Sequence, residues 1–226
     1  MPDKNGDIIT ECITGTVAKA ADRYAMDVMG LKSLMLMETA SSKIAEYVMK
    51  HYPLSHKISV LCGVGNNGAD GVCASRILLR EGYQPHIYIV GSLEKASWEF
   101  LYQLCHFQQA GGVVTMYRPN TLPDDDILID GIFGIGLHRE IAGDYRIFIE
   151  EANRHRHGFV LAIDAPSGIN TDTGALMGCG IKADVTITFG RNKTGLVRGA
   201  GQELAGRVLV EDIGIPDEAY IAAEEA

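Results

Sequence analysis

Two kinds of hydrophobic spacing alternate along this chain of 226 residues. Short runs that are almost continuously apolar are typical of parallel strands buried on both faces. Between many of them, apolar residues recur every three or four positions, which predicts amphipathic helices. We therefore expect a mostly parallel sheet with helices on both faces. The predicted strands are 58–62, 86–90, 113–116, 127–130, 159–163, 184–189 and 207–210.

The helical spacing is clearest in three stretches. A helix with Asp70 as its N-cap is predicted over residues 70–81, and Gly82 follows its end. The helical segment 10–51 must pack on the sheet or on a partner. Two other helices have apolar faces, formed by Met37, Ala40, Ile44 and Val48 in one and by Phe100, Leu101, Leu104 and Phe107 in the other.

The chain is predicted to form one domain over residues 1–226. No repeat, charge block or low-complexity linker interrupts residues 10–215, and only the two ends outside this ordered core are expected to be loose. The fold class is α/β, a Rossmann-like three-layer α/β/α sandwich with a mostly parallel sheet.

Composition narrows the class of protein further. With 29 acidic and 20 basic residues the net charge is −9, which argues against nonspecific binding to nucleic acid or to an anionic membrane. No apolar run approaches the roughly 18 residues of a membrane span. The polar N-terminus has no signal-peptide core, so a cytoplasmic location is expected. Five widely spaced cysteines without a CxxC pair predict reduced thiols rather than disulfides or a zinc site.

Many of the 26 glycines follow predicted strands. All carboxyl ends of a parallel sheet lie at one edge, and ligands bind in the crevice there. Loops rich in Gly, Asn, Asp and Ser that follow four of the strands are therefore expected to form one site. These loops are GVGNNGADG after residue 62, GIFGIGLHRE after 130, APSG after 164 and GRNKTGLVRG after 189.

The first loop has the GxGxxG pattern at Gly63, Gly65 and Gly68. Glycines at this spacing let backbone N–H groups at a helix N-terminus approach a phosphate, although a tight turn without a ligand has the same pattern. The next strand does not end in the acidic residue that would hold a ribose, and neither a Tyr-x-x-x-Lys pair nor GK[ST] follows. The loop therefore predicts phosphate binding. The missing signals argue against an ordinary NAD-dependent dehydrogenase and against a nucleoside triphosphatase.

Two aspartates end separate strands at the same edge. Asp130 and Asp164 would repel each other unless a cation lay between them or one of them took part in proton transfer. Each is also consistent with a simple turn in which the side chain binds nearby backbone. Asn, Asp and Ser oxygens suit a hard cation rather than zinc or copper. In the second loop Gly134–Gly136 offers further N–H donors and Arg139 a cation for phosphate, whereas Lys193 in the fourth loop is expected to be solvated.

Seven segments carry a further pattern: Ala21–Tyr24, Leu36–Glu38, Gly63–Gly71, Asp130–Gly136, Asp164–Ile169, Lys193–Gly195 and Asp212–Pro216. Together, and in this order, they resemble the N-terminal-type YjeF domain, the NAD(P)H-hydrate epimerase family. The resemblance covers nearly the whole chain. One departure is Ala69, where the family usually has glycine, because a positive φ would strain alanine.

The resemblance implies interconversion of the R and S epimers of hydrated NADH or NADPH, in which water has added across the nicotinamide ring. It implies one potassium ion per subunit, held by Asn67, Asp130 and Ser167. It also implies a homodimer and a separate NAD(P)H-hydrate dehydratase as pathway partner, with no fused dehydratase domain. The residues implied to contact the hydrated dinucleotide are Asn66, Asn67, Gly68, Ala69, Asp70, Gly134, Ile135, Gly136, Leu137, His138, Arg139, Glu140 and Asp164.

Asp164 is the expected catalytic residue. A carboxylate can protonate the leaving ring hydroxyl, stabilise the iminium cation and activate the returning water. Ring opening and reclosure is an alternative chemistry, and a non-catalytic nucleotide- or protein-binding module is an alternative function. Retention of Asn67, Asp130, Asp164 and Ser167 favours the enzyme, because a scaffold has no chemical need for this set.

Overall fold

The computed structural model describes residues 12–155 and 158–225. Within them seven strands form one fully parallel sheet in the order β3-β2-β1-β4-β5-β6-β7. Every predicted strand is confirmed, with each end within one residue of its predicted position. The strands are β1 (Ile58–Cys62), β2 (Pro85–Ile89), β3 (Val113–Met116), β4 (Ile127–Gly131), β5 (Phe159–Ile163), β6 (Val185–Phe189) and β7 (Arg207–Glu211).

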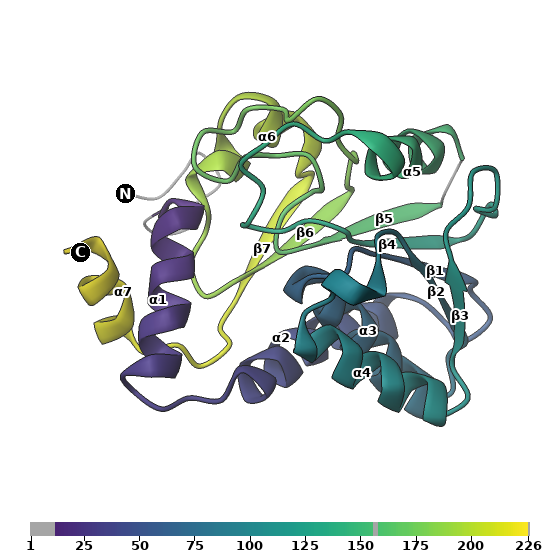
Figure 1. Ribbon diagram of the computed structural model, residues 1–226, viewed down its shortest axis with the longest axis horizontal. Helices are drawn as coiled ribbons and strands as arrows, with labels where there is room; N and C mark the ends of the chain where they lie inside the picture. The colour runs from purple at the N-terminus through teal and green to yellow at the C-terminus, as the bar shows by residue number, and fades with distance from the viewer. Residues whose placement is uncertain (1–11, 156–157, 226) are drawn as a thin grey trace.

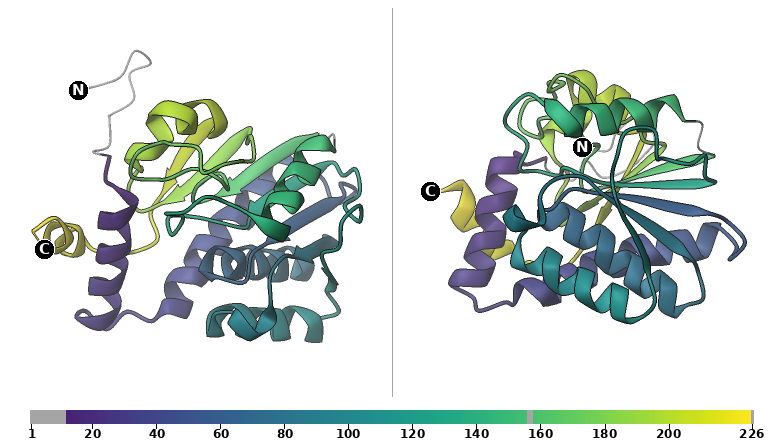
Figure 2. Two further views of the ribbon diagram at one scale, coloured as in Figure 1. Left: turned by 45° about the horizontal axis from the view of Figure 1, so that its top comes forward. Right: turned by 45° about the vertical axis from the view of Figure 1, so that its right-hand side comes forward.

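Helices cover both faces of this sheet, as Figures 1 and 2 show. On one face lie α2 (Ser33–His51), α3 (Asn66–Arg80) and α4 (Trp98–Gln109), and on the other α5 (Gly143–Arg154) and α6 (Gly199–Leu204). Two short 3₁₀ turns, η1 (Leu93–Lys95) and η2 (Thr194–Val197), lie in the connections. The predicted three-layer α/β/α sandwich is confirmed.

The alternation of side chains along the central strands divides the core into two layers. In β1, Val60 and Cys62 pack in the cluster under α2, α3 and α4, whereas Leu61 packs in the cluster under α5. All five residues of β1 are buried, as are those of β4. Strands buried on both faces explain why these segments are apolar without interruption.

Helices α1 (Gly15–Asp27) and α7 (Asp217–Glu224) stand beside the sheet and pack on each other. Small side chains on α1, including Ala21 and Ala25, let α7 approach with Ala219 and Tyr220. The expectation of a loose tail after residue 215 is therefore wrong, because α7 has a buried apolar face. The helical N-terminal segment divides into α1 and α2, of which only α2 packs in the layer on the sheet; residues 10 and 11 lie outside the described part.

Two details of the helix predictions need correction. Helix α3 begins at Asn66, after Gly65 as its N-cap, so Asp70 lies inside the helix and does not cap it. Ala69 consequently has helical backbone and no positive φ. In α4, Leu101 is 43% exposed, while Phe100, Leu104 and Phe107 form the buried face. The predicted end of α3 is correct, since Gly82 follows it with φ of +93°.

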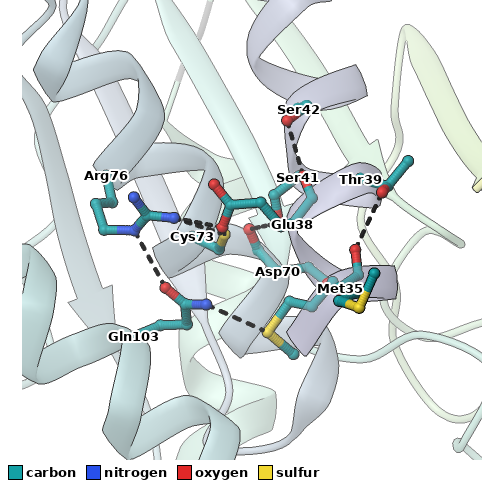
Figure 3. A network of polar contacts seen from close by, with 10 residues as sticks. Met35, Glu38, Thr39, Ser41, Ser42, Asp70, Cys73, Arg76 and Gln103 are labelled. Atoms are coloured by element: carbon teal, nitrogen blue, oxygen red, sulfur yellow. Dashed lines mark hydrogen bonds and ion pairs between the residues drawn. The ribbon is translucent and has the colours of Figure 1, made fainter. Parts of the chain in front are cut away.

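Polar contacts join α2, α3 and α4 in a helix-layer network of Met37, Glu38, Arg76 and Gln103, of which the last three are labelled in Figure 3. The Arg76 guanidinium donates to the Glu38 carboxylate and, through Nε, to Gln103 Oε1 at 3.2 Å. Gln103 Nε2 lies 3.8 Å from Met37 Sδ. Nearby, Ser41 Oγ donates to the backbone oxygen of Asp70 at 3.1 Å, which ties α2 to the first turns of α3.

Candidate active site

The strand order reverses between β1 and β4, which are neighbours in the sheet. Such a reversal opens a crevice at the carboxyl ends of the strands. A cavity of about 410 Å³ lies at this edge, lined by residues of three of the predicted loops and by Asp164, which directly precedes the remaining loop. The lining residues from this edge are Gly65, Asn66, Asn67, Asp70, Ile132, Phe133, Gly134, Ile135, Gly136, Leu137, Asp164, Phe189 and Lys193.

Helices from outside the sheet form the other walls of the cavity. Asp22 and Met26 of α1, Met37 of α2 and Tyr220 of α7 line it. Neither α1 nor α7 was expected here from the sequence, because α1 precedes the first strand of the sheet and the residues of α7 were expected to be loose. The cavity is therefore closed by elements that the sequence analysis expected only to pack or to be loose.

The first loop presents the N-terminus of α3 to the cavity. No side chain caps this helix, so backbone N–H groups of its first turn are not occupied by a cap. The loop is tightly folded: a Cβ on Gly68 would lie 1.8 Å from the carbonyl oxygen of Gly63. Gly68 and Ala69 are buried, whereas Asn66, Asn67 and Asp70 line the cavity.

The second loop brings Gly134 between two functional side chains. A Cβ on Gly134 would lie 2.8 Å from Asn67 Oδ1 and 3.3 Å from Asp164 Oδ2, so glycine leaves room beside both oxygens. Residues 135–137 also line the cavity. The structure does not bring the next three predicted residues to the cavity, because His138, Arg139 and Glu140 are exposed and outside its lining.

Asp164 is held in an unusual backbone conformation at the end of β5. Its φ is +64°, in the left-handed region that costs a non-glycine residue roughly 1–3 kcal/mol. The side chain is almost buried, and its Oδ1 accepts hydrogen bonds from Thr188 Oγ1 at 3.0 Å and Lys193 Nζ at 2.8 Å. Its second oxygen, Oδ2, faces Gly134 in the cavity.

Lys193 is not the solvated loop residue that the sequence analysis expected. It is 2% exposed, and Nζ donates to Asp164, to Thr188 Oγ1 at 2.9 Å and to the Phe189 carbonyl at 2.8 Å. Its loop is fixed because Thr194 N donates to the Ile13 carbonyl at 2.8 Å, which joins the loop to the chain before α1. A lysine in a glycine-rich loop carries no local signal of burial, so only this tertiary contact identifies its role.

Two residues expected to hold potassium, Asp130 and Ser167, are fully buried and do not line the cavity. The Asp130 carboxylate accepts from Ser167 N at 2.7 Å and from Ser167 Oγ at 2.5 Å. Ser167 Oγ in turn accepts from Phe133 N at 2.9 Å. Burial raises the pKa of Asp130 to about 6, although the hydrogen bonds from Ser167 lower it. These bonds connect the loops after β4 and β5.

The donor set fits a hard cation. No ion pair among the described residues includes Asp130, so its buried carboxylate has no cationic side chain beside it. The amide Nδ2 of Asn67 is buried without a hydrogen-bond partner. Because a flip of the amide exchanges nitrogen and oxygen, an oxygen can occupy this position instead. Carboxylate, hydroxyl and amide oxygens are ligands that hard cations prefer.

Three carboxylates of the cavity share one buried ammonium group, that of Lys193, while the exposed Lys19 also lines the cavity. Asp22, Asp70, Asp164 and Lys193 form what we call the cavity cluster. Burial, followed by the charge of Asp164, raises the pKa of Asp22 to about 6, while Lys193 lowers it. Burial also raises the pKa of Asp70 well above its ordinary value, with smaller contributions from Asp164, Asp22 and Glu99. The cavity thus contains carboxyl groups that can carry a proton near neutral pH.

In the described part of the chain, no three His, Cys, Asp or Glu side chains gather as a metal-binding group. In the same residues, no helix has the length and apolar character needed to cross a bilayer. Cys62 and Cys73 are buried in the core, as expected for small apolar groups.

Comparison with known proteins gives a consistent result. Residues 33–195 match the family model described as YjeF-related protein N-terminus. A Limosilactobacillus fermentum protein named NAD(P)H-hydrate epimerase is 43% identical over 204 residues, which cover 89% of this chain and 96% of its own. A protein of the same name from Leuconostoc gelidum is 35% identical, over 95% and 96% of the two chains. The crystal structure of yeast ynu0, YNL200c, has a TM-score of 0.79 at 19% identity over 94% and 93% of the chains, which shows a shared fold.

Proposed function

The chain belongs to the family of YjeF-related protein N-termini, and on that premise we propose that its cavity binds hydrated NADH or NADPH and that Asp164 acts on the nicotinamide ring. The enzyme is an isomerase, an NAD(P)H-hydrate epimerase that repairs the damaged cofactor by interconverting its R and S epimers. The observation that carries the assignment of the site is the carboxylate of Asp164. One of its oxygens is held by Lys193, and the other faces the cavity.

The dinucleotide is held mainly by backbone groups. In this proposal its pyrophosphate lies at the N-terminus of α3, where N–H groups and the helix dipole favour an anion. Asn66 and Asn67 offer side-chain contacts from the same turn, and Gly134–Leu137 forms the facing wall. An acidic protein with a net charge of −9 thereby binds an anion without a basic surface.

Asp164 supplies the chemistry at the ring. The ion pair with Lys193 and the bond from Thr188 both fall on Oδ1, so Oδ2 is the oxygen directed at the ligand. A carboxylate so placed stabilises the iminium cation left when the ring hydroxyl departs, and it exchanges a proton with the water that leaves or returns. Preorganised charge in a site with little water is worth more than in bulk solvent.

Potassium belongs to the same proposal. Asn67, Asp130 and Ser167 would hold the ion, and when bound it would supply a positive charge beside the buried carboxylate of Asp130. The hydrogen bonds of Ser167 to Asp130 and from Phe133 keep the loops after β4 and β5 together. Removal of potassium is therefore expected to loosen these loops and slow epimerisation.

One assay tests the proposal. Purified protein is mixed with the R epimer of hydrated NADH, and appearance of the S epimer is followed by chromatography with potassium, with sodium instead, and without enzyme. We expect epimerisation well above the rate without enzyme, and faster with potassium than with sodium. A rate equal to that without enzyme would refute the assigned reaction. Equal rates in potassium and in sodium would refute only the proposed role of potassium and would leave the assigned reaction intact.

Three expectations about the partner, the oligomeric state and the location of the protein stay predictions. They are the pathway partnership with a separate NAD(P)H-hydrate dehydratase, the homodimer and the cytoplasmic location. The first is tested by complete repair of a hydrate mixture when the two purified enzymes are combined, and the second by the mass of the protein in solution.

A further inference from the structure

Epimerisation moves a hydroxyl group from one face of a ring to the other. A proton must reach the departing oxygen on one face, and a proton must leave the incoming water on the opposite face. One carboxylate that reaches both faces or two carboxylates on opposite sides would satisfy this requirement. Building on the proposed function, we infer that Asp22 of α1 is the second catalytic carboxylate, which transfers the proton on the face of the ring opposite Asp164.

The side chain of Asp22 points into the cavity. Ala18, Asp22 and Met26 follow one another at intervals of four residues and all line the cavity, so they form one face of α1. The neighbouring face, with Ala21 and Ala25, packs on α7. The orientation of α1 about its own axis is therefore set by packing, and this directs Asp22 toward the ligand site.

Asp22 and Asp164 reach the cavity from different parts of the fold. Asp164 lies at the carboxyl end of β5, whereas α1 stands beside the sheet (Figures 1 and 2). The start of α1 is fixed, because Thr16 donates from N and Oγ1 to the two carboxylate oxygens of Asp172 at 2.9 and 2.7 Å. A ring bound in this cavity would meet one carboxylate carried by α1 and another carried by the end of β5.

The two carboxylates differ in their freedom to exchange a proton. Oδ1 of Asp164 is occupied by Lys193 and Thr188. No hydrogen bond or ion pair among the described residues fixes the carboxylate of Asp22, and burial together with Asp164 raises its pKa to about 6. The groups that face Asp22 are Lys19 on its own helix, Asp70 on α3, Asp164 and Lys193 at the sheet edge and Tyr220 on α7.

Asp70 is less suited to this role than Asp22. Burial, followed by three neighbouring carboxylates, raises its pKa well above the ordinary value, so its charged form is disfavoured. An acid that exchanges a proton in each turnover needs a pKa close to the working pH. Asp70 therefore serves better as a neutral hydrogen-bond donor to the ligand.

The step balances without any co-reactant. Asp22 gives its proton to the ring hydroxyl oxygen, the carbon–oxygen bond breaks with its electron pair on oxygen, and water leaves an iminium cation. A water molecule on the other face forms the new carbon–oxygen bond and gives its proton to Asp164 Oδ2. The reverse direction exchanges the two roles, and proton exchange with solvent restores both carboxyl groups. No atom is oxidised or reduced.

The test separates the two faces with oxygen-labelled water. For each purified epimer, chromatography measures conversion to the other epimer, and mass spectrometry measures incorporation of heavy oxygen into the starting epimer. For Asp22→Asn we expect conversion to fall about a hundredfold. In this variant, the rate of heavy-oxygen incorporation into the epimer whose hydroxyl faces Asp164 should stay within a few-fold of the wild-type rate. The reason is that this face of the ring keeps its own carboxylate.

Controls keep the outcome interpretable. Asp27→Asn makes the same change at an exposed position of the same helix and should leave both measurements unchanged. Asp22→Glu should restore part of the conversion, and circular dichroism checks that each variant is folded. Wild-type conversion in Asp22→Asn, or loss of labelling and conversion in equal proportion for both epimers, would overturn the inference. Failure of the wild-type enzyme to epimerise would instead refute the proposed function.

Discussion

The helix-layer network and the cavity cluster are built around the same helix, α3, but balance their charges differently. In the helix-layer network one guanidinium, Arg76, pairs with one carboxylate, Glu38, and Arg76 Nε also donates to Gln103. In the cavity cluster the three carboxylates of Asp22, Asp70 and Asp164 have one buried ammonium group among them, that of Lys193, and the other lysine of the cavity, Lys19, is exposed. One region is electrically balanced, and the other has an excess of negative charge.

This difference in charge balance distinguishes a region that serves packing, the helix-layer network, from one suited to chemistry, the cavity cluster. The pair Glu38–Arg76 is partly exposed, and such pairs contribute roughly 0–1 kcal/mol to folding. Carboxylates gathered in a cavity oppose one another's ionisation, which costs stability and raises pKa values. Groups with perturbed pKa values in a cleft are characteristic of functional sites. The unbalanced region is where a proton can be exchanged.

The largest effect is expected when the single ammonium group of the cavity cluster is removed. Lys193→Met leaves Asp164 buried without its ionic partner and should lower the free energy of unfolding by about 3 kcal/mol. Epimerisation should fall as well, because Asp164 loses the bond that orients it. Urea unfolding measures the first effect and the epimer assay the second.

A double variant serves as the control for that prediction. Asp164→Asn combined with Lys193→Met removes both charges and should recover part of the lost stability, whereas the helix-layer network stays intact. If Lys193→Met alone is as stable as the wild-type protein, the buried ion pair is not what holds Asp164 in place.

The next largest effect concerns catalysis without a loss of fold. Asp164→Asn keeps the shape of the side chain, and asparagine tolerates the left-handed backbone at φ of +64°. Epimerisation should fall about a hundredfold, a typical value for loss of an acid–base group. Thermal unfolding should confirm a folded protein. Normal epimer exchange in this variant would exclude Asp164 from the reaction.

A smaller effect is expected in the pH dependence of stability. The pKa of Asp22 is about 6 in the folded protein and about 3.9 when unfolded, so the folded state binds the proton more tightly. Its contribution to stability is complete below about pH 4 and is lost as the pH rises through about 6. The Asp22→Asn variant has no carboxylate to ionise at this position. The difference between its melting temperature and that of the wild-type protein should therefore increase as the pH rises from about 4 through about 6. A constant difference would contradict the raised pKa.

The smallest effect should come from the balanced region. Arg76→Gln removes the ion pair with Glu38 and is expected to cost no more than about 1 kcal/mol, with epimerisation unchanged. It is the matched counterpart of Lys193→Met, because each removes one cation from one region. A larger cost for Arg76→Gln than for Lys193→Met would reverse the comparison between the two regions.

The sheet and the four loops could be predicted because their signals are local. A buried parallel strand such as β1 or β4 must be apolar on both faces, and a backbone that turns tightly onto a helix needs glycine, as at Gly68. The convergence of Asn67 and Asp164 followed from topology alone, since parallel strands share one edge. The positions of His138, Arg139 and Glu140 relative to the cavity depend on a long loop without such a constraint.

The sequence by itself determined the layers, the sheet edge that bears the site and the family of the chain. Only the tertiary structure decided that Lys193 is buried against Asp164, that α7 is ordered and that Asp22 lies in the cavity. The physical reason is that periodicity and glycine report the path of the backbone, which neighbouring residues specify. Burial, charge pairing and pKa depend on which distant side chains approach, and Asp22 and Lys193 meet Asp164 only after the chain has folded.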